Sequence, residues 1–287
     1  MSNLTFHHCL RLLLQAATAA GVALLLGCAS APLPDVATQR FDAAYRTGSE
    51  KYAAGDLQAA ANAFAQAERM AALYDRRAQR LQALLSMGAV AATREDAAAA
   101  LQAYTLAQAE ARGLGDAHSA AVAAAGMAEL QRRAGNYAMA LQGLEQALAP
   151  AALRAESTER LQARLGRALV WNAMGQSAAA RDALQALESE ARASHGTLLP
   201  AVLAGQAVVL RDSGAVAEAI DKTQEALEWD RHFSNPFALA ADLELLGKLY
   251  LVSGRNTESR VNLERALRIV QTTGQTRAVE RLRQLLP

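Results

Sequence analysis

The residue types that most often do chemistry in proteins are few and scattered in this sequence. Beyond residue 27 its histidines are His118, His195 and His232, and none has a second ligand type at the close spacing of a metal site. No serine lies in a strand–turn–helix elbow, and no glycine-rich loop could hold a phosphate. Acidic residues alternate with arginines three or four positions away, as on a solvated helix surface. We therefore expect no catalytic residues, no metal and no other cofactor.

The two cysteines, Cys9 and Cys28, direct attention to the N-terminus instead. Residues 1–27 have the pattern of an export signal, in which Arg11 and no acidic residue precede an apolar run from Leu12 to Leu26. That run is shorter than the roughly 20 residues that a helix needs to span a bilayer. Removal of residues 1–27 would leave Cys28 as the only thiol, so an internal disulfide is excluded.

The end of this segment, Leu25-Leu26-Gly27-Cys28, resembles the bacterial lipobox. The resemblance implies cleavage between Gly27 and Cys28, and acylation (palmitate) of a Cys28 that carries diacylglycerol on its sulfur. Because no aspartate follows the cysteine directly, it also implies a lipoprotein anchored in the outer membrane and facing the periplasm. Several acyl chains hold a protein stably at a membrane. Residues 28–40 contain Pro32 and Pro34 and are expected to form a flexible tether. An ordinary signal peptide with an incidental cysteine is the alternative.

Through the rest of the chain a turn recurs at nearly constant spacing. It falls at Gly55, Glu95, Gly135, Gly175, Gly214 and Gly254, with spacings of 40, 40, 40, 39 and 40 residues. Glycine permits the left-handed conformation that ends a helix, so Glu95 is expected to turn differently or to carry mild strain. Good helix N-caps follow four of the six turns, at Asp56, Asp96, Asn136 and Asn256. Each turn is therefore expected to join two antiparallel helices.

Small and large residues recur in register with these turns. Small residues stand seven positions before the turn, at Gly48, Gly88, Ala128, Ala168, Ala207 and Gly247. They return five positions after it, at Ala60, Ala100, Ala140, Ala180, Ala219 and Ser259. With one exception they return again twelve positions after it, at Ala67, Ala107, Ala147, Leu187, Ala226 and Ala266. Between these come residues that are mostly larger, at Phe64, Tyr104, Leu144, Leu184, Thr223 and Leu263. Such a pattern brings two helices close together, with the large residue filling the gap between them.

This pattern resembles the tetratricopeptide repeat (TPR), most fully in LLGKLYLVSG at 245–254. The resemblance implies an all-α, right-handed superhelical solenoid of six TPR-like repeats over residues 41–276, with a capping helix at 277–287. The usual TPR period is about 34 residues, so a period of 40 requires longer helices or longer loops. Inter-repeat loops are expected at 73–77, 113–119, 149–159, 194–200, 231–237 and 272–276, and the three histidines fall in them. Trp171 and Trp229 stand at periodic positions of helices and are expected in the core.

The TPR resemblance also implies a concave groove lined by the first helix of each repeat. The groove positions carried onto this chain are Tyr45, Ser49, Tyr52, Gln82, Glu129, Arg132, Arg133, Gln162, Asn172, Arg211, Asp212 and Lys248. Tyr45 and Tyr52 are the expected aromatic anchors, with arginine and lysine as polar contacts. The alternative is that these side chains only keep the inner face soluble. The basic residues do not match the carboxylate clamp of chaperone-binding TPR proteins.

Charge excludes one class of partner: 29 basic against 28 acidic residues leave no field that favours nucleic acid. The function expected is a lipid-anchored periplasmic scaffold that binds other envelope proteins, for example in pilus, secretin or outer-membrane assembly. A regulator or activator of a periplasmic enzyme, such as a peptidoglycan synthase or hydrolase, is the alternative. A cytoplasmic sensor array would require residues 1–28 to be something other than a signal. The sequence specifies neither the partner nor the oligomeric state.

Overall fold

The computed structural model describes residues 35–149, 157–193 and 196–286. The expected signal peptide, its cleavage position at Gly27, the lipidation position Cys28 and His195 lie outside these residues. The chain divides into two compact units, residues 1–39 and 40–287. Helix α2 begins at Val36, after Asp35 Oδ1 accepts a hydrogen bond from the Thr38 amide at 3.1 Å. The expected tether at 28–40 is therefore helical from Val36 onward, because Asp35 caps that first turn.

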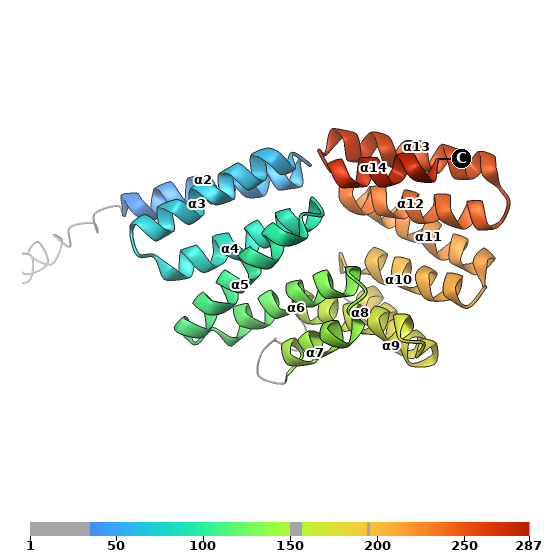
Figure 1. Ribbon diagram of the computed structural model, residues 1–287, viewed down its shortest axis with the longest axis horizontal. Coiled ribbons are helices and arrows are strands. Elements are labelled where there is room, and N and C mark those ends of the chain that lie inside the picture. The colour runs from blue at the N-terminus through green and yellow to red at the C-terminus, as the bar shows by residue number, and fades with distance from the viewer. Residues whose placement is uncertain (1–34, 150–156, 194–195, 287) are drawn as a thin grey trace, which may run out of the picture. The chain divides into compact units, whose positions relative to one another are not determined.

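The described residues form thirteen helices and no strand. In chain order these are α2 (Val36–Ala53), α3 (Leu57–Leu73), α4 (Arg77–Thr93), α5 (Ala97–Leu114), α6 (Ala117–Arg133), α7 (Tyr137–Ala147), α8 (Thr158–Ala173), α9 (Ser177–Ala193), α10 (Leu199–Asp212), α11 (Val216–His232), α12 (Pro236–Val252), α13 (Asn256–Thr272) and α14 (Thr276–Leu285). Within residues 40–287, each helix packs on its neighbours in the chain, as Figure 1 shows. They make six antiparallel pairs, α2–α3 to α12–α13, followed by α14. None of these helices is long and apolar enough to cross a membrane.

Ten of the helix-ending turns share one geometry, whether they lie within a repeat or between repeats, and the connections that follow α7 and α9 are only partly described. At the first, the Gly55 amide donates to the Tyr52 carbonyl at 2.9 Å and the Asp56 amide donates to the Lys51 carbonyl at 2.9 Å. This pair of bonds is the Schellman motif, which requires a left-handed residue. The residues with positive φ are Gly55, Asp75, Glu95, Gly115, Gly135, Gly175, Gly214, Ser234, Gly254 and Gly274. From 55 to 135 and from 214 to 274 they recur every twentieth residue, which is half of the period seen in the sequence.

The expectation of long inter-repeat loops is therefore wrong at most positions. Residues 74–76, 233–235 and 273–275 separate helices as tight turns, and His118 and His232 lie on helices, exposed to solvent. The extra residues of each period extend the helices. Nine of the described helices are 17 or 18 residues long: α2, α3, α4, α5, α6, α9, α11, α12 and α13. The turns at Asp75 and Ser234 contain no glycine at the left-handed position, because short polar residues tolerate that conformation. Glu95 adopts the same turn as the glycines, with φ of 60°. The expectation that it turns differently is therefore wrong, and the expectation of mild strain remains.

Two of the expected N-caps make the bond and two do not. Asp56 accepts from the Ala59 amide at 3.0 Å, and Asp96 accepts from the Ala99 amide at 3.3 Å. The Asn136 amide group instead donates to Gln131 Oε1 at 2.9 Å, and Asn256 is already inside α13. Side-chain caps supply one of the orphan amides at a helix start, so the first two turns are the better satisfied.

The core lies between paired helices, where large side chains sit on glycines of the facing helix. A Cβ placed on Gly88 would lie 2.6 Å from Cε1 of Tyr104, and one on Gly126 would lie 2.5 Å from its Cζ. The Tyr104 ring is thus held between α4 and α6, and it is only 7% exposed. Gly48 faces Phe64 in the same way. The small and large positions expected from the sequence are buried throughout, from Ala60 to Ala266. Trp171 and Trp229 are half-buried, and each packs against a cluster of buried core residues.

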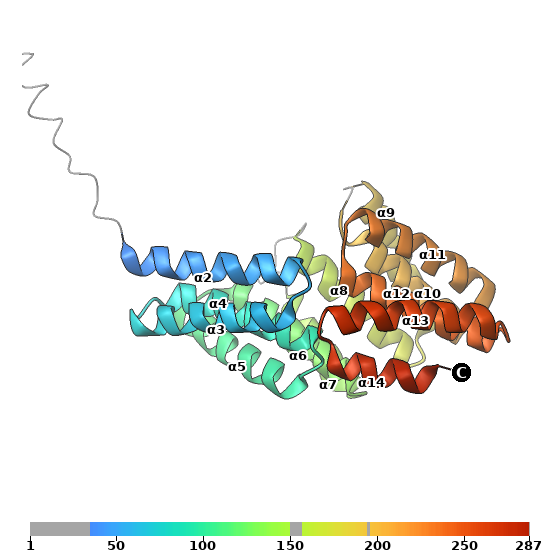
Figure 2. The same cartoon turned by 90° about the horizontal axis from the view of Figure 1, so that it is seen from above.

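The first and last repeats of residues 40–287 touch one another. The rings of Tyr52 and Phe237 are 5.1 Å apart, and a Cβ on Gly55 would lie 2.9 Å from the Thr273 methyl. Glu95 pairs with Arg281 at 2.6 Å, and Arg277 donates to the Glu95 carbonyl. Figures 1 and 2 both show the α2–α3 turn beside the α13–α14 turn. We call these seven residues the closure: Tyr52, Gly55, Glu95, Phe237, Thr273, Arg277 and Arg281.

Candidate partner-binding cavity

A cavity of about 820 Å³ lies beside the closure, and we call it the central cavity. Helices from both ends of the stack line it: α4, α5 and α6 on one side, and α12, α13 and α14 on the other. Its apolar wall includes Leu130, Phe237, Ala240 and Val270. Because no single repeat contains this space, it exists only where the ends of the stack meet.

The lining of the central cavity also contains six charged side chains. Four are cations, and two are carboxylates: Arg132, Arg133, Lys248, Arg281, Glu95 and Glu244. Arg281 bridges the two carboxylates, at 2.6 Å from Glu95 and 3.0 Å from Glu244. Glu244 also accepts from Lys248 Nζ at 2.6 Å. One guanidinium therefore joins α14 to the α4–α5 turn and to α12.

Two carboxylates at the cavity, Glu244 and Glu129, have a pKa below the usual range. Burial alone would raise the pKa of Glu244, but hydrogen bonds from Arg281 and Lys248 outweigh it and hold that pKa below the usual range. Glu129, behind the cavity, follows the same rule, because its bonds to Arg132 and Arg133 overcome its burial and lower its pKa. The same ion pairs raise the pKa of Arg281 against the effect of its own burial. The ion pairs therefore favour the charged forms of Glu244, Glu129 and Arg281.

A second cavity of about 440 Å³ adjoins the first. Arg132 and Arg133 line both cavities, so they form the wall between them. Glu129 accepts from both, at 2.7 Å from Arg132 Nε and 2.8 Å from Arg133 Nε. Most of the remaining lining is apolar, with Leu85, Val122, Leu144, Leu165 and Leu169. This second cavity could receive an apolar side chain from a segment bound in the central cavity.

The structure brings together five of the twelve positions expected in the groove. Arg132, Arg133 and Lys248 line the central cavity, and Glu129 and Gln162 line the second. Asn172, Arg211 and Asp212 form a separate cluster, in which Asn172 Nδ2 donates to Asp212 Oδ2 at 2.7 Å. Arg211 pairs with Asp212 at 2.7 Å. Gln82 is exposed, and it lies outside the lining of both cavities.

The three remaining positions, at Tyr45, Ser49 and Tyr52, are already engaged inside the protein. Tyr45 stacks on Phe41 at 5.6 Å, and its hydroxyl lies 2.9 Å from Ser86 Oγ. Tyr52 packs on Phe237, and its hydroxyl lies 3.1 Å from Thr93 Oγ1. Ser49 donates to the Tyr45 carbonyl at 3.1 Å. Tyr45 and Tyr52 therefore hold neighbouring repeats and the closure together, and their role as anchors for a partner stays a prediction.

Sequence reasoning missed Glu95, Phe237, Glu244 and Arg281 as cavity residues. Glu95 carried a usable signal, since it is the only non-glycine among the six expected turns. Its side chain reaches the other end of the stack, which glycine could not do. Arg281 carried no signal, because its role depends on residues that lie 186 positions away in the chain.

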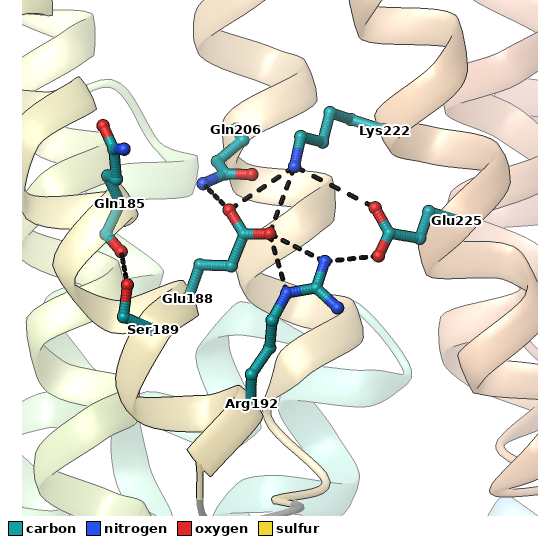
Figure 3. Close-up of polar contacts among 7 residues, drawn as sticks. All are labelled: Gln185, Glu188, Ser189, Arg192, Gln206, Lys222 and Glu225. Carbon is teal, nitrogen blue, oxygen red and sulfur yellow. Dashed lines mark hydrogen bonds and ion pairs between the residues drawn. The ribbon is translucent and has the colours of Figure 1, made fainter.

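Two other polar networks lie outside the cavities and are balanced in charge. In Figure 3, Glu188 on α9 accepts from Gln206 on α10 and from Arg192, and Lys222 on α11 reaches it at 3.2 Å. Arg192 also pairs with Glu225, which completes a set of two cations and two carboxylates. Burial would raise the pKa of Glu188, but the hydrogen bonds from Gln206, Arg192 and Lys222 lower it. The second network joins Arg77 and Arg80 to Glu68 and Glu110 across α3, α4 and α5, again two against two.

The described residues contain no group of three side chains that could hold a metal ion. Two carboxylates outside the cavities are buried. Asp230 on α11 and Asp242 on α12 are each 3% exposed. Burial raises the pKa of Asp230 to about 6, and burial together with the charge of Asp230 raises the pKa of Asp242 to about 8. The pair therefore holds a proton at neutral pH.

Comparison with known proteins identifies the fold and no family. No protein-family model matches the sequence, and no curated protein matches it significantly. Among solved structures, the chain resembles NprR in complex with its cognate peptide NprX, with a TM-score of 0.70, 12% identity, and coverage of 94% of this chain and 78% of NprR. It resembles the apo form of RapI with a TM-score of 0.66, 12% identity and coverage of 93% and 96%.

A Rap protein complexed with competence and sporulation factor is also similar, with a TM-score of 0.64, 10% identity and coverage of 86% and 74%. At these identities the likeness shows the fold alone. The chain is an all-α, right-handed superhelical solenoid of six TPR-like repeats with a C-terminal capping helix, as its sequence predicted. The function has to be argued from the central cavity itself.

Proposed function

We propose that this protein is a lipid-anchored scaffold of the bacterial cell envelope that binds a segment of a partner protein in its central cavity. One observation carries the binding part of the proposal: a cavity of about 820 Å³ is lined from both ends of the stack by charged side chains and Phe237. Recognition sites for protein segments combine an apolar surface with a few fixed polar groups.

The similar structures support the same use of the fold. NprR is described in complex with its cognate peptide NprX, and a Rap protein with competence and sporulation factor. A segment bound here would contact α4–α6 and α12–α14 at once, so its binding would depend on the whole solenoid. A partner that is itself an enzyme would make this protein a regulator, and its capture would reveal that.

The anchor rests on the sequence at residues 25–28, LLGC. An acylated Cys28 would hold the repeats at the periplasmic face of the outer membrane, because only residues 29–35 separate it in sequence from α2, which begins at Val36. Growth of the producing cells with a labelled fatty acid tests this. The wild-type chain should be labelled and the Cys28→Ala variant should not, while both are exported. Absence of label from both would reject the lipoprotein.

Photocrosslinking in whole cells tests the binding site. A photoreactive amino acid is placed at Ala241, which is exposed and lines the central cavity. The matched control carries it at Gln185, which is exposed on α9 outside both cavities. We expect a specific protein adduct from position 241 and none from 185. Adducts from 185 alone, identified by mass spectrometry, would move the binding face away from the central cavity.

A further inference from the structure

Charge around the central cavity is unbalanced, and this sets it apart from the other ion networks of the described chain. The Glu188 network and the Arg80 network each match two cations with two carboxylates. The central cavity has four cations and two carboxylates in its lining. Counting Glu129 behind it raises the carboxylates to three, still short of the cations. Arg277 beside it donates to a main-chain carbonyl.

The closure depends on one of these scarce carboxylates. Both Glu95 oxygens lie 2.6 Å from Arg281 Nη1, and this pair ties the α4–α5 turn to α14. Arg281 has a second carboxylate in Glu244, whose side chain is 12% exposed and which also holds Lys248. Glu95 is more accessible, with its side chain 27% exposed, at the tip of a turn. Of the two partners of Arg281, Glu95 is the one that can leave for solvent.

We propose that the central cavity selects a partner segment with carboxylate side chains, and that one of these carboxylates replaces Glu95 on Arg281 and so releases the closure. This inference rests on the proposed function, since it names the chemistry of the segment bound there. Exchange of one carboxylate for another leaves no buried charge unpaired, because Arg281 keeps Glu244 throughout. A guanidinium holds two carboxylates well, since its donors form a planar fork.

The remaining lining says what else the segment carries. Arg132 and Arg133 share Glu129, so each has donor capacity beyond that single carboxylate. Phe237, Ala240 and Leu130 add an apolar surface to the same lining. Acidic residues that alternate with apolar ones therefore suit the cavity. The summed positive charge would also speed the encounter at low salt.

Binding of synthetic peptides to the full chain in detergent micelles tests this selection. The probes are three fluorescein-labelled peptides of about ten residues, composed of Glu and Leu, of Gln and Leu, or of Lys and Leu. We expect the Glu peptide to bind tightest and to weaken when salt is raised, because charge pairing is screened. Arg281→Gln should weaken it about tenfold. Arg80→Gln is the control, since Arg80 also bridges two glutamates but lies outside both cavities.

Replacement of Glu95 by a peptide carboxylate on Arg281 predicts that one substitution strengthens peptide binding. Glu95→Gln removes the carboxylate that competes for Arg281, so it should tighten binding of the Glu peptide severalfold. Spin labels at Ala54 and Thr272, exposed beside the closure, follow its opening in a chain with Cys9 and Cys28 replaced by serine. The Glu peptide should lengthen the distance between the two labels.

Each part can fail separately. Tighter binding of the Gln or Lys peptide, or no binding of the Glu peptide, overturns the acidic segment, while crosslinks from position 241 still report on the proposed function. Weaker binding by Glu95→Gln, or an unchanged label distance, overturns the exchange. Equal binding of a labelled oligothymidylate would show a general anion site and overturn selection of a protein segment.

Discussion

The joints between successive repeats and the closure between the first and last repeats are held together by different interactions. At a joint, the ring of Tyr104 lies against glycines of α4 and α6, with no room for another carbon atom. At the closure, Arg281 and Glu95 meet at a partly exposed ion pair, next to one aromatic contact between Tyr52 and Phe237. Close apolar packing contributes far more free energy than an exposed ion pair does. The joints therefore hold the fold, and the closure can open while the fold persists.

The largest effect is expected at a joint. Tyr104→Ala removes a ring that is 7% exposed, and the loss of contacts together with the cavity left behind should lower the free energy of unfolding by about 3–5 kcal/mol. Urea denaturation followed by circular dichroism measures this. Tyr74→Ala is the matched control, because Tyr74 is 42% exposed and should change stability by less than about 0.5 kcal/mol. Equal effects of the two variants would contradict the packing described for Tyr104.

A single added carbon at the same joint should also be costly. Gly88→Ala places a Cβ 2.6 Å from Tyr104 Cε1, so the ring or α4 must shift, at about 1–3 kcal/mol. In Gly166→Ala the new Cβ meets Leu144 Cδ2 at 3.4 Å, an ordinary contact, and the better helix former should stabilise the protein by roughly 0.5–1 kcal/mol. Opposite changes in the free energy of unfolding for these two Gly→Ala substitutions would show that contact between the new Cβ and the large facing residue determines the effect. A stabilised Gly88→Ala variant would disprove it.

One joint differs from the others, because Asp230 and Asp242 are buried between α11 and α12. Burial raises the pKa of Asp230 to about 6 and of Asp242 to about 8, so the folded protein binds more protons than the unfolded chain. Stability from this pair is full below the unfolded value, near pH 4, and is lost as the pH rises through 6 and then 8.

Asp242→Asn should therefore flatten the fall in thermal midpoint between pH 6 and 9, and stabilise the protein by about 1 kcal/mol or more at pH 9. Asp221→Asn, on the exposed face of α11, should keep the wild-type slope. Scanning calorimetry across this pH range measures both variants. A variant at position 242 with the wild-type slope would show that the pair does not hold a proton.

The smallest effect on stability is expected at the closure. Arg281→Gln removes partly exposed ion pairs, so the free energy of unfolding should fall by about 1 kcal/mol or less. The distance between labels at Ala54 and Thr272 should nevertheless lengthen, since Arg281 links α14 to Glu95. A fall in the free energy of unfolding as large as that of Tyr104→Ala would contradict the distinction between joints and closure.

Much of the fold could be predicted from local patterns. Ala60, Ala100 and Ala140 are fully buried as their spacing required, and the turns at Gly55, Gly135 and Gly175 are left-handed. The turns at Asp75 and Ser234 could not be recognised, because these residues adopt the same conformation without a distinctive composition. For that reason the sequence predicts loops where the structure has tight turns between repeats.

The site could be predicted less well. The groove positions that the TPR pattern supplied include Arg132, Arg133 and Lys248, which do line the central cavity. The pattern treats every repeat alike, so it could not tell that Tyr45 and Tyr52 are occupied by Phe41 and Phe237. Nor could it distinguish Asn172, which pairs with Asp212, from a residue free to bind a partner.

The sequence by itself determined the repeating unit, because the spacing of small and large residues is set by contacts between helices that are near in the chain. It also carries the N-terminal pattern that ends at Cys28, from which we propose the membrane anchor. Only the tertiary structure decided that Glu95 meets Arg281 and that a charged cavity lies beside them. Those contacts join residues 186 positions apart, so they depend on small rotations added over the intervening repeats, and no local pattern of residues records that sum.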